Sequence, residues 1–470
     1  MHGANNKIRV AYLTPALRAE GRALIALGMP MALTQLIQFS VNTIDVLMIG
    51  RLGAEPLAAS SLGLVFFFAA WLVGYGPAMA VSPMISQALG AKGNDHDYVR
   101  RSVRMGLWGL ALMTPFVGLF FVNAGAIAGF LGQPDHLADM AGPYILALLP
   151  GWPFALAIFI LRNFLAALGL TRAPLVVIIG TTALNAGLNW LLIYGNLGFP
   201  QLGLVGAGIA SSAANMTGFF VLALYCRLHE KPRAFAVFRD IFKPDWRVGR
   251  EVFRLGWPIG VTTAFEGFLF NACVLLMGRI GVSEMAAFQV ALNVAALAFM
   301  GPLGMSMAGA VRVGLHAGAG DEDGVRRAAF LTVLICALMM CLAAALVLAA
   351  PMAVAGLYLQ TDDPENILVI DLVVKFMTIA AAFMLFDGIQ VAANQALRGL
   401  KDVHAPMLIT GVSYWLVGFP LAAWLGLASP LGASGVWWGL LASLSTAALL
   451  LSVRLYQQTR SQKTRHQQIQ

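Results

Sequence analysis

The sequence predicts an all-α polytopic membrane protein with twelve transmembrane helices in two pseudo-symmetric lobes of six, related as parallel repeats. Three observations predict this fold: the composition, a series of long apolar stretches and an internal repeat. Hydrophobic residues make up 59% of the 470 residues, charged residues make up only 11%, and the mean hydropathy is +0.78. Because soluble domains contain about 25% charged residues, the composition excludes a soluble globular protein.

Twelve apolar stretches follow one another along the chain, and each is long enough to cross a bilayer as a helix. They are rich in Leu and Ala and lack the alternation of polar and apolar residues that a transmembrane β-barrel requires. The predicted spans are 23–49, 57–83, 102–128, 138–161, 173–195, 203–226, 253–278, 286–311, 328–356, 370–396, 405–427 and 431–455.

The distribution of basic residues predicts the orientation. With the N-terminus inside, all but three of the 30 Lys and Arg residues fall in cytoplasmic segments, the exceptions being Arg51, Arg279 and Lys375. This pattern follows the positive-inside rule and accounts for the net charge of +8 without a nucleic-acid partner. The first 22 residues lack the apolar region and cleavage site of a signal peptide. We therefore expect a multi-pass protein with both termini in the cytoplasm.

The second half of the chain repeats the first at an offset of 228 residues, which places Pro30 on Pro258 and Gly90 on Gly318. Each copy contains an even number of spans, so both copies enter the membrane in the same direction, as in several secondary transporters. The predicted division is a cytoplasmic segment 1–22, an N-lobe 23–226, a cytoplasmic linker 227–252, a C-lobe 253–455 and a cytoplasmic tail 456–470.

Three acids inside the predicted spans, Asp45, Glu266 and Asp387, mark the candidate site. An acid near the middle of a spanning helix costs about 2.5–3.5 kcal/mol, and the predicted spans place no Lys or Arg beside these three. Unpaired acids at that depth are expected to bind protons, metal cations or a cationic substrate. Polar residues expected to support them, although each could simply join neighbouring helices, are Gln38, Asn42, Asn185, Asn189, Ser211, Gln289, Asn293, Gln390 and Asn394.

Motif searches exclude several other classes of protein. No GxxxxGK[ST] motif is present, so ATP is not the expected energy source, and no HExxH or GxSxG motif indicates an enzyme. The four cysteines and seven histidines lack the spacing of a disulfide framework or a zinc site. We therefore expect a gradient-driven transporter that is not an enzyme, has no cofactor and is a monomer in the lipid bilayer.

Three stretches resemble the multidrug and toxic compound extrusion (MATE) transporters, and more narrowly their NorM-type bacterial branch. They are IDVLMIGRLGAEPLAASSLG (44–63), FEGFLFNACVLLMGRIG (265–281) and FDGIQVAANQALRGLKD (386–402), and the resemblance extends over essentially the whole chain. It implies a transporter of the bacterial inner membrane that exports amphipathic organic cations and other drugs in exchange for Na+ or H+.

The resemblance also assigns roles to residues. Asp45 matches the acid of the N-lobe site, and Asn185 and Asn189 match the polar pair beside it, although some members have an acid where Asn189 stands. Glu266 and Asp387 match the C-lobe pair of the NorM-type branch, whose oxygens suit Na+ and can equally bind protons. The sequence leaves Na+ and H+ open as coupling ions.

Two alternatives remain beside the antiporter. A lipid-linked oligosaccharide flippase of the same superfamily shares the twelve-helix core, but we expect such a protein to have basic residues in its cavity. A polytopic membrane enzyme is disfavoured by the missing catalytic motifs.

Overall fold

The computed structural model describes residues 15–91, 95–359 and 366–467, with side chains described as far as residue 460. Within these ranges the chain forms helices and turns and no β-strand, and twelve helices or helix runs are long and apolar enough to cross a membrane. The all-α fold with twelve spans is therefore confirmed, whereas most of the predicted segment 1–22 lies outside the described residues.

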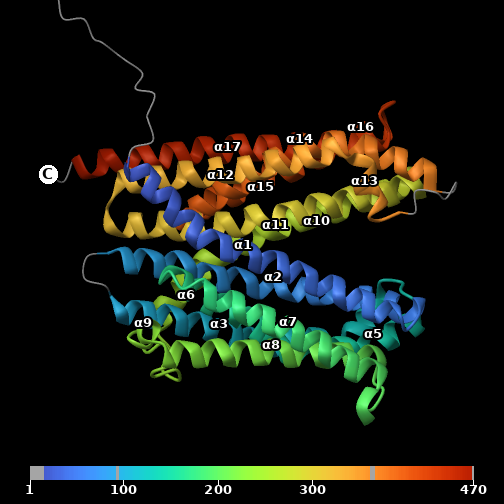
Figure 1. Cartoon of the computed structure of the whole chain (residues 1–470), viewed down its shortest axis with the longest axis horizontal. Helices are drawn as coiled ribbons and strands as arrows, with labels where there is room; N and C mark the ends of the chain where they lie inside the picture. Colours follow the sequence, from blue (N-terminus) through green and yellow to red (C-terminus); the bar gives the residue numbers. More distant parts are fainter. Residues whose placement is uncertain (1–14, 92–94, 360–365, 468–470) are drawn as a thin grey trace, which may run out of the picture.

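The helices follow the predicted order (Figure 1). The spanning elements are α1 (Pro15–Gly50), α2 (Ala54–Gly90), α3 (His96–Val122), α5 to α6 (Asp135–Ala167), α7 (Arg172–Tyr194), α8 (Gly203–Leu228), α10 (Trp246–Ile280), α11 (Val282–Ala319), α12 (Glu322–Ala349), α14 (Ile367–Gly399), α15 to α16 (His404–Leu427) and α17 (Ala433–Gln467). Three short helices lie between them: α4 (Ala124–Phe130), α9 (Glu230–Arg233) and α13 (Pro351–Gly356).

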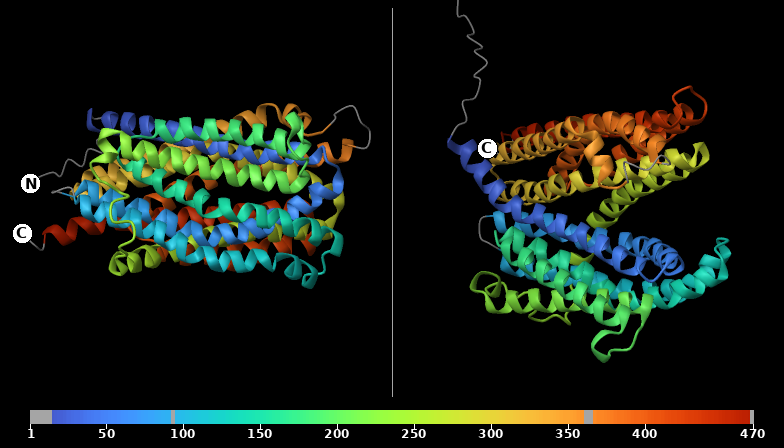
Figure 2. Two further views of the ribbon diagram at one scale, coloured as in Figure 1. Left: turned by 90° about the horizontal axis from the view of Figure 1, so that it is seen from below. Right: turned by 45° about the vertical axis from the view of Figure 1, so that its right-hand side comes forward.

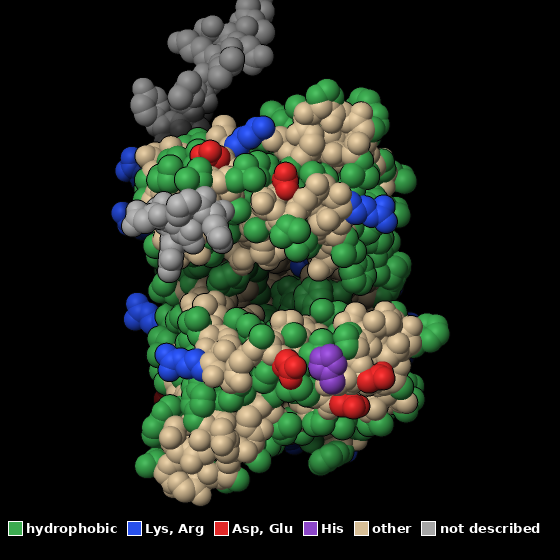
Figure 3. Space-filling model, turned by 90° about the vertical axis from the view of Figure 1, so that its right-hand side faces the viewer, with side chains coloured by type: hydrophobic (Ala, Val, Ile, Leu, Met, Phe, Trp, Pro, Cys, Tyr) green, Lys and Arg blue, Asp and Glu red, His purple; other side chains and the backbone are tan. Residues whose placement is uncertain are grey.

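The spanning helices form two lobes, an N-lobe of α1 to α8 and a C-lobe of α10 to α17 (Figure 1). The lobes are in contact near the end of the molecule where α1 begins and α17 ends, which we call the termini end, and they diverge toward the opposite end (Figure 2). Seen from that opposite end, the molecule is hollowed between the lobes, and the hollow is lined mainly by hydrophobic side chains (Figure 3). The fold thus has a cleft that is open at one end only.

Contacts between the lobes obey the two-fold symmetry that the repeat predicts. α1 packs against α11, and α2 packs against α10, so the repeat offset converts the first pair into the second. At the termini end, a Cβ atom on Gly90 would overlap the carbonyl oxygen of Leu315, and one on Gly318 would overlap that of Gln87. The offset of 228 residues places Gly90 on Gly318 and Gln87 on Leu315, so it converts one of these contacts into the other. Only glycine permits backbones to approach this closely, so the four residues form a symmetric junction between the lobes.

A second pair of close contacts lies deeper in the interface, between equivalent glycines and partners that differ by one helical turn. A Cβ atom on Gly76 would overlap the carbonyl oxygen of Gly256, and one on Gly304 would overlap the backbone of Ala32. Gly76 and Gly304 are equivalent in the repeat, so the same position in both lobes forms a close backbone contact. The two lobes are therefore related as parallel repeats about an axis between them.

Two of the predicted spans are interrupted. The predicted span 138–161 forms α5 and α6, joined by a 3-10 turn at Leu149–Gly151, because Pro150 cannot donate a backbone hydrogen bond. Ser212 of α8 compensates for the break: its hydroxyl donates to the Ala147 carbonyl at 2.6 Å and accepts from the Gly151 N–H at 3.2 Å. Inside a membrane such compensation is required, since no water is available to the freed backbone groups.

The predicted span 405–427 forms α15 (His404–Gly411), a π-helical turn (Val412–Gly418) and α16 (Phe419–Leu427). Within the wider turn, the carbonyl of Ser413 accepts a hydrogen bond from the Ser443 hydroxyl at 3.2 Å. The wider turn also places Tyr414 in the interior, where it is fully buried. π-helical turns occur frequently at functional sites, and this one contributes a side chain to the candidate site described below.

The linker packs against the N-lobe. Phe235 and Val237 are buried, the Trp108 indole donates to the Ile241 carbonyl at 2.7 Å, and the Arg104 guanidinium donates to the Asp240 carbonyl at 3.1 Å. These contacts hold the linker under the termini end of the N-lobe before the chain enters α10.

Candidate functional site

Four of the predicted side chains form a closed ring of hydrogen bonds between α1, α7 and α8, which we call the N-lobe cluster: Asp45, Asn185, Asn189 and Ser211. Asn189 Nδ2 donates to Asp45 Oδ1 at 2.6 Å, and Ser211 Oγ donates to Asp45 Oδ2 at 3.5 Å. Asn185 Nδ2 donates to Ser211 Oγ at 3.2 Å, and Asn189 Nδ2 also donates to Asn185 Oδ1 at 3.3 Å. Both carboxylate oxygens of Asp45 therefore accept hydrogen bonds from neutral groups.

The environment of this ring suits a positive charge. Asn185 and Asn189 are buried, Asp45 is half-buried, and Asn189 Oδ1 is a buried oxygen without a hydrogen-bond partner. A half-buried carboxylate that is held by two neutral donors keeps an uncompensated negative charge, which attracts a proton or a cationic group. Asn42, one turn before Asp45 on α1, is exposed and lies outside the ring.

A second group, the C-lobe cluster, consists of Glu266 on α10, Asp387, Gln390 and Asn394 on α14, and Tyr414 in the π-helical turn. Spacings of three and four residues place the three α14 side chains on one helical face, and each is at most 5% exposed. Gln390 Nε2 donates to the Tyr414 hydroxyl at 2.8 Å. The charge of Glu266 acts on both Asp387 and Tyr414, so α10 contributes an acid within electrostatic range of these two residues.

Three oxygens of this cluster have no hydrogen-bond partner within the described structure: Asp387 Oδ1, Gln390 Oε1 and Asn394 Oδ1. Each buried acceptor left unpaired costs about 1–3 kcal/mol of desolvation. Carboxylate and amide oxygens are the ligands that hard cations such as Na+ prefer. The C-lobe cluster therefore has the donor set of a cation site, and the same acids can bind protons.

The expectation that no Lys or Arg accompanies the acids is wrong, because two of the three buried arginines among the described residues, Arg162 and Arg398, lie near the polar residues of the site. Arg162 on α6 is 5% exposed and Arg398 on α14 is 8% exposed. The predicted spans ended at residues 161 and 396 and so placed both arginines outside the membrane, whereas α6 and α14 continue past them. The positive charge of Arg398 acts on Glu266, so this acid has a nearby cation.

Arg162 is held by amides instead of a carboxylate. Its Nη1 donates to Gln38 Oε1 at 2.7 Å, its Nη2 donates to Gln35 Oε1 at 2.8 Å, and its guanidinium lies over the Phe159 ring at 5.1 Å. Gln38, predicted as a cavity residue, therefore binds a buried cation. Tyr75 of α2 packs edge-on against Phe159 with ring centroids 5.9 Å apart.

Sequence reasoning missed Arg162, Arg398, Tyr75 and Tyr414. The available signal for the arginines was weak: in FILRNFLAAL a single Arg stands between apolar residues, which is unusual for a cytoplasmic turn. Two predicted residues of α11 join neither cluster, since Gln289 is exposed and Asn293 Nδ2 donates to the Gln289 carbonyl of its own helix at 3.0 Å.

Two parallel six-helix lobes around a cleft, each with a buried polar cluster that contains an acid, define a secondary membrane transporter. Comparison with known proteins then identifies the family. The family model MatE matches residues 30–191 and 258–424, once in each lobe, and the two matches start 228 residues apart. The chain belongs to the MatE family of transporters, and it is not an enzyme.

Relatives and solved structures agree with this assignment. The chain is 40% identical over 438 residues to the probable multidrug resistance protein NorM of Rhizobium meliloti (strain 1021), covering 93% of both chains. It is 36% identical over 457 residues to the multidrug resistance protein NorM of Burkholderia vietnamiensis, covering 96% of this chain and 97% of the relative. A solved multidrug resistance MATE family transporter in an outward-facing conformation matches with a TM-score of 0.85 at 19% identity, covering 97% of this chain and 99% of that one.

Proposed function

We propose that this transporter exports amphipathic organic cations and other drugs from the cytoplasm in exchange for Na+ or H+. The names of its relatives support drugs as the substrate class, in preference to lipid-linked oligosaccharides. The observation on which the coupling proposal rests is the set of three unpaired oxygens in the C-lobe cluster, next to the carboxylate of Glu266. A cation or proton bound there pairs with groups that are otherwise buried without a partner.

The orientation follows from charge and completes the proposal. The positive-inside rule places the termini end in the cytoplasm, because that end carries most of the basic residues. The lobes meet at this end, and we infer that the cleft faces the outside of the inner membrane. Reporter fusions at the C-terminus and within residues 229–245 should both give a cytoplasmic signal, and a periplasmic signal from either fusion contradicts the orientation.

Coupling requires only that the cation prefer one of the two states. A cation that enters the outward-facing cleft and binds the C-lobe cluster shifts the equilibrium in proportion to its differential affinity for the two states. Reciprocal linkage then requires a bound drug to weaken cation binding by the same factor. Asp45, which is half-buried and lacks a basic partner among the described side chains, is proposed to interact with the cationic group of the drug.

The test is efflux of ethidium from liposomes under separately imposed Na+ and pH gradients. Asp387→Asn and Glu266→Gln should abolish gradient-driven efflux, since loss of one charged ligand weakens cation binding by at least about tenfold. Asp371→Asn is a matched control, because Asp371 is an exposed acid on the same helix as Asp387. Efflux at the wild-type rate by both cluster variants would refute coupling at the C-lobe cluster. In the wild-type protein, the gradient that drives efflux identifies the coupling ion.

A further inference from the structure

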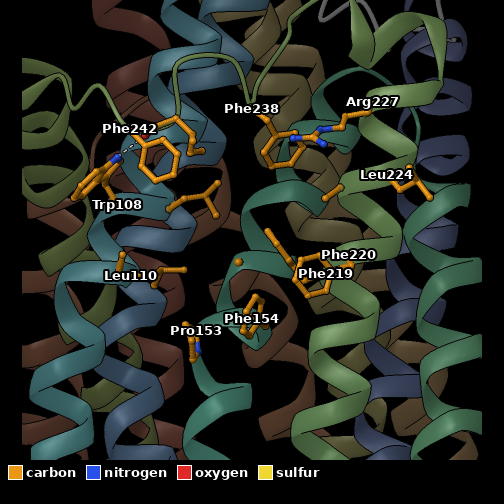
Figure 4. Close-up of a pocket in the computed structure, with 15 residues that line it drawn as sticks. Trp108, Leu110, Pro153, Phe154, Phe219, Phe220, Leu224, Arg227, Phe238 and Phe242 are labelled. Carbon is orange, nitrogen blue, oxygen red and sulfur yellow. Dashed lines mark hydrogen bonds between the residues drawn. The ribbon is translucent and has the colours of Figure 1, made fainter.

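A groove of about 900 Å³ lies on the N-lobe, between α3, α6 and α8, and is closed at one end by linker residues 238–242 (Figure 4). We call it the linker groove. Figure 4 shows Phe238 and Arg227 at the linker end of the groove and Pro153 and Phe154 toward its other end. Nearly all of its lining is apolar, and it shares no residue with the N-lobe cluster.

The groove opens on the outer surface of the helix bundle. Phe220 and Leu224 of α8 line it and are 57% and 55% exposed, and Phe242 of the linker is 86% exposed. In a membrane-spanning chain, exposed apolar side chains of this kind face lipid. The volume is at the upper end of the range for small-molecule pockets, about 300–1,000 Å³. The space is therefore large enough for an elongated apolar ligand that enters from the bilayer.

The polar groups at the groove select the kind of headgroup. The Trp108 indole N–H is already donated to the Ile241 carbonyl at 2.7 Å. The exposed guanidinium of Arg227 lies over the Phe238 ring at 5.3 Å, and no carboxylate among the described residues forms an ion pair with it. Asp240, the acid in the adjacent part of the linker, is instead paired with Lys243 at 2.9 Å. Arg227 thus keeps free donors at the linker end of an apolar groove.

We propose that the linker groove binds the acyl chains of an anionic phospholipid of the surrounding bilayer, with its phosphate at Arg227. The surrounding charge is complementary, because residues 227–252 contain seven Lys and Arg against four Asp and Glu. Basic residues at the cytoplasmic surface attract anionic lipids at about 1 kcal/mol each. A cationic drug is disfavoured here, since no acid among the described residues lines the groove and Arg227 would repel it.

Such a lipid contacts both the N-lobe and the linker. Phe238, Ile241 and Phe242 form the linker side of the groove, and α3, α6 and α8 form the other sides. The bound lipid therefore holds the linker against the N-lobe. The linker is the segment that must accommodate any movement of one lobe relative to the other.

Native mass spectrometry of the full chain, with added dioleoyl phosphatidylglycerol or dioleoyl phosphatidylcholine, tests the proposal. Arg227→Gln should weaken phosphatidylglycerol binding about fivefold and phosphatidylcholine binding less, because the choline ammonium offsets the charge of the phosphate. Arg460→Gln is the matched control, because Arg460 is also exposed and also lies over an aromatic ring, that of Tyr456 at 4.7 Å.

Filling the groove should remove both lipids. Ala223→Phe and Ala111→Phe add volume from α8 and from α3, and either one suffices if the other fails to fold. Ala345→Phe, on an exposed part of α12, should bind lipid as the wild type does. Equal binding of the two lipids by the wild type, undiminished binding by a folded groove variant, or displacement of phosphatidylglycerol by ethidium would each overturn the proposal, and none of these outcomes depends on the coupling site.

Discussion

Replacing Glu20 with Gln is expected to shift the equilibrium between the two arrangements of the lobes. Glu20 lies on α1, is 5% exposed, and accepts hydrogen bonds from Arg312 and His316 of α11 in the other lobe. The Arg312 Nε to Glu20 Oε1 distance is 2.7 Å, and the His316 Nε2 to Glu20 Oε2 distance is 3.0 Å. These contacts join the lobes at the termini end, so a state that opens this end must break them.

The size of the effect follows from the exposure of the partners. Hydrogen bonds to charged groups are worth about 1.5–3 kcal/mol each, but the Arg312 side chain is 23% exposed, so solvent weakens its contribution. Because glutamine keeps the shape and one acceptor, we expect a loss of about 2 kcal/mol from the closed termini end. This corresponds to a shift of about thirtyfold toward the state that is open at that end.

Distances between spin labels at the termini end measure this shift. Asp97 on α3 and Asp323 on α12 are exposed positions in opposite lobes, and Cys341, the exposed native cysteine, is first replaced by Ala. Glu20→Gln should broaden the distance distribution toward larger separations, while Glu230→Gln, a change at an exposed acid of the linker, should not. An unchanged distribution in Glu20→Gln, or an equal change in Glu230→Gln, would show that the ion pair does not hold the lobes together.

Two further substitutions test the packing. Gly90→Ala places a Cβ on the carbonyl oxygen of Leu315, so it should destabilise the closed termini end by about 1–3 kcal/mol. The same spin-label distances should lengthen, whereas Gly129→Ala, where a Cβ meets nothing within 4 Å, should leave them unchanged. Ser212→Ala leaves the Gly151 N–H without its partner inside the membrane and should lower stability by about 1–3 kcal/mol. Thermal unfolding in detergent measures this loss, and a melting temperature equal to that of the wild type would contradict the assigned role of Ser212.

The repeat and the shared face of Asn185 and Asn189 were predictable from regular spacing, whereas the place of Asp45 beside them was implied by the family resemblance. A fixed offset between equivalent glycines revealed the two lobes, and Gly90 and Gly318 indeed occupy equivalent places between them. Asn185 and Asn189 lie one helical turn apart, so they had to share a face, and Asp45 is the acid that this face meets. Spacing along a helix is local information that the sequence contains directly.

The buried arginines could not be found in this way. A hydropathy window ends a span at a charged residue, so Arg162 and Arg398 were assigned to cytoplasmic turns. What stabilises Arg162 in the interior is a pair of glutamine oxygens that come from α1, more than 120 residues away in the chain. The pairing depends on which helices become neighbours, and periodicity within one helix does not contain that information.

The symmetric junction at Gly90, Leu315, Gly318 and Gln87 has an implication for the origin of the molecule. Contacts that are exchanged by a two-fold axis are isologous, as in a homodimer of six-helix chains that were later fused into one. In such a dimer every substitution alters both subunits at once. A fused chain is free of this constraint, and Gln38 and Glu266, which occupy equivalent positions in the two copies, differ: the first binds Arg162, and the second is an acid. Joining two identical halves thus allowed the two sides of the cleft to acquire different chemistry.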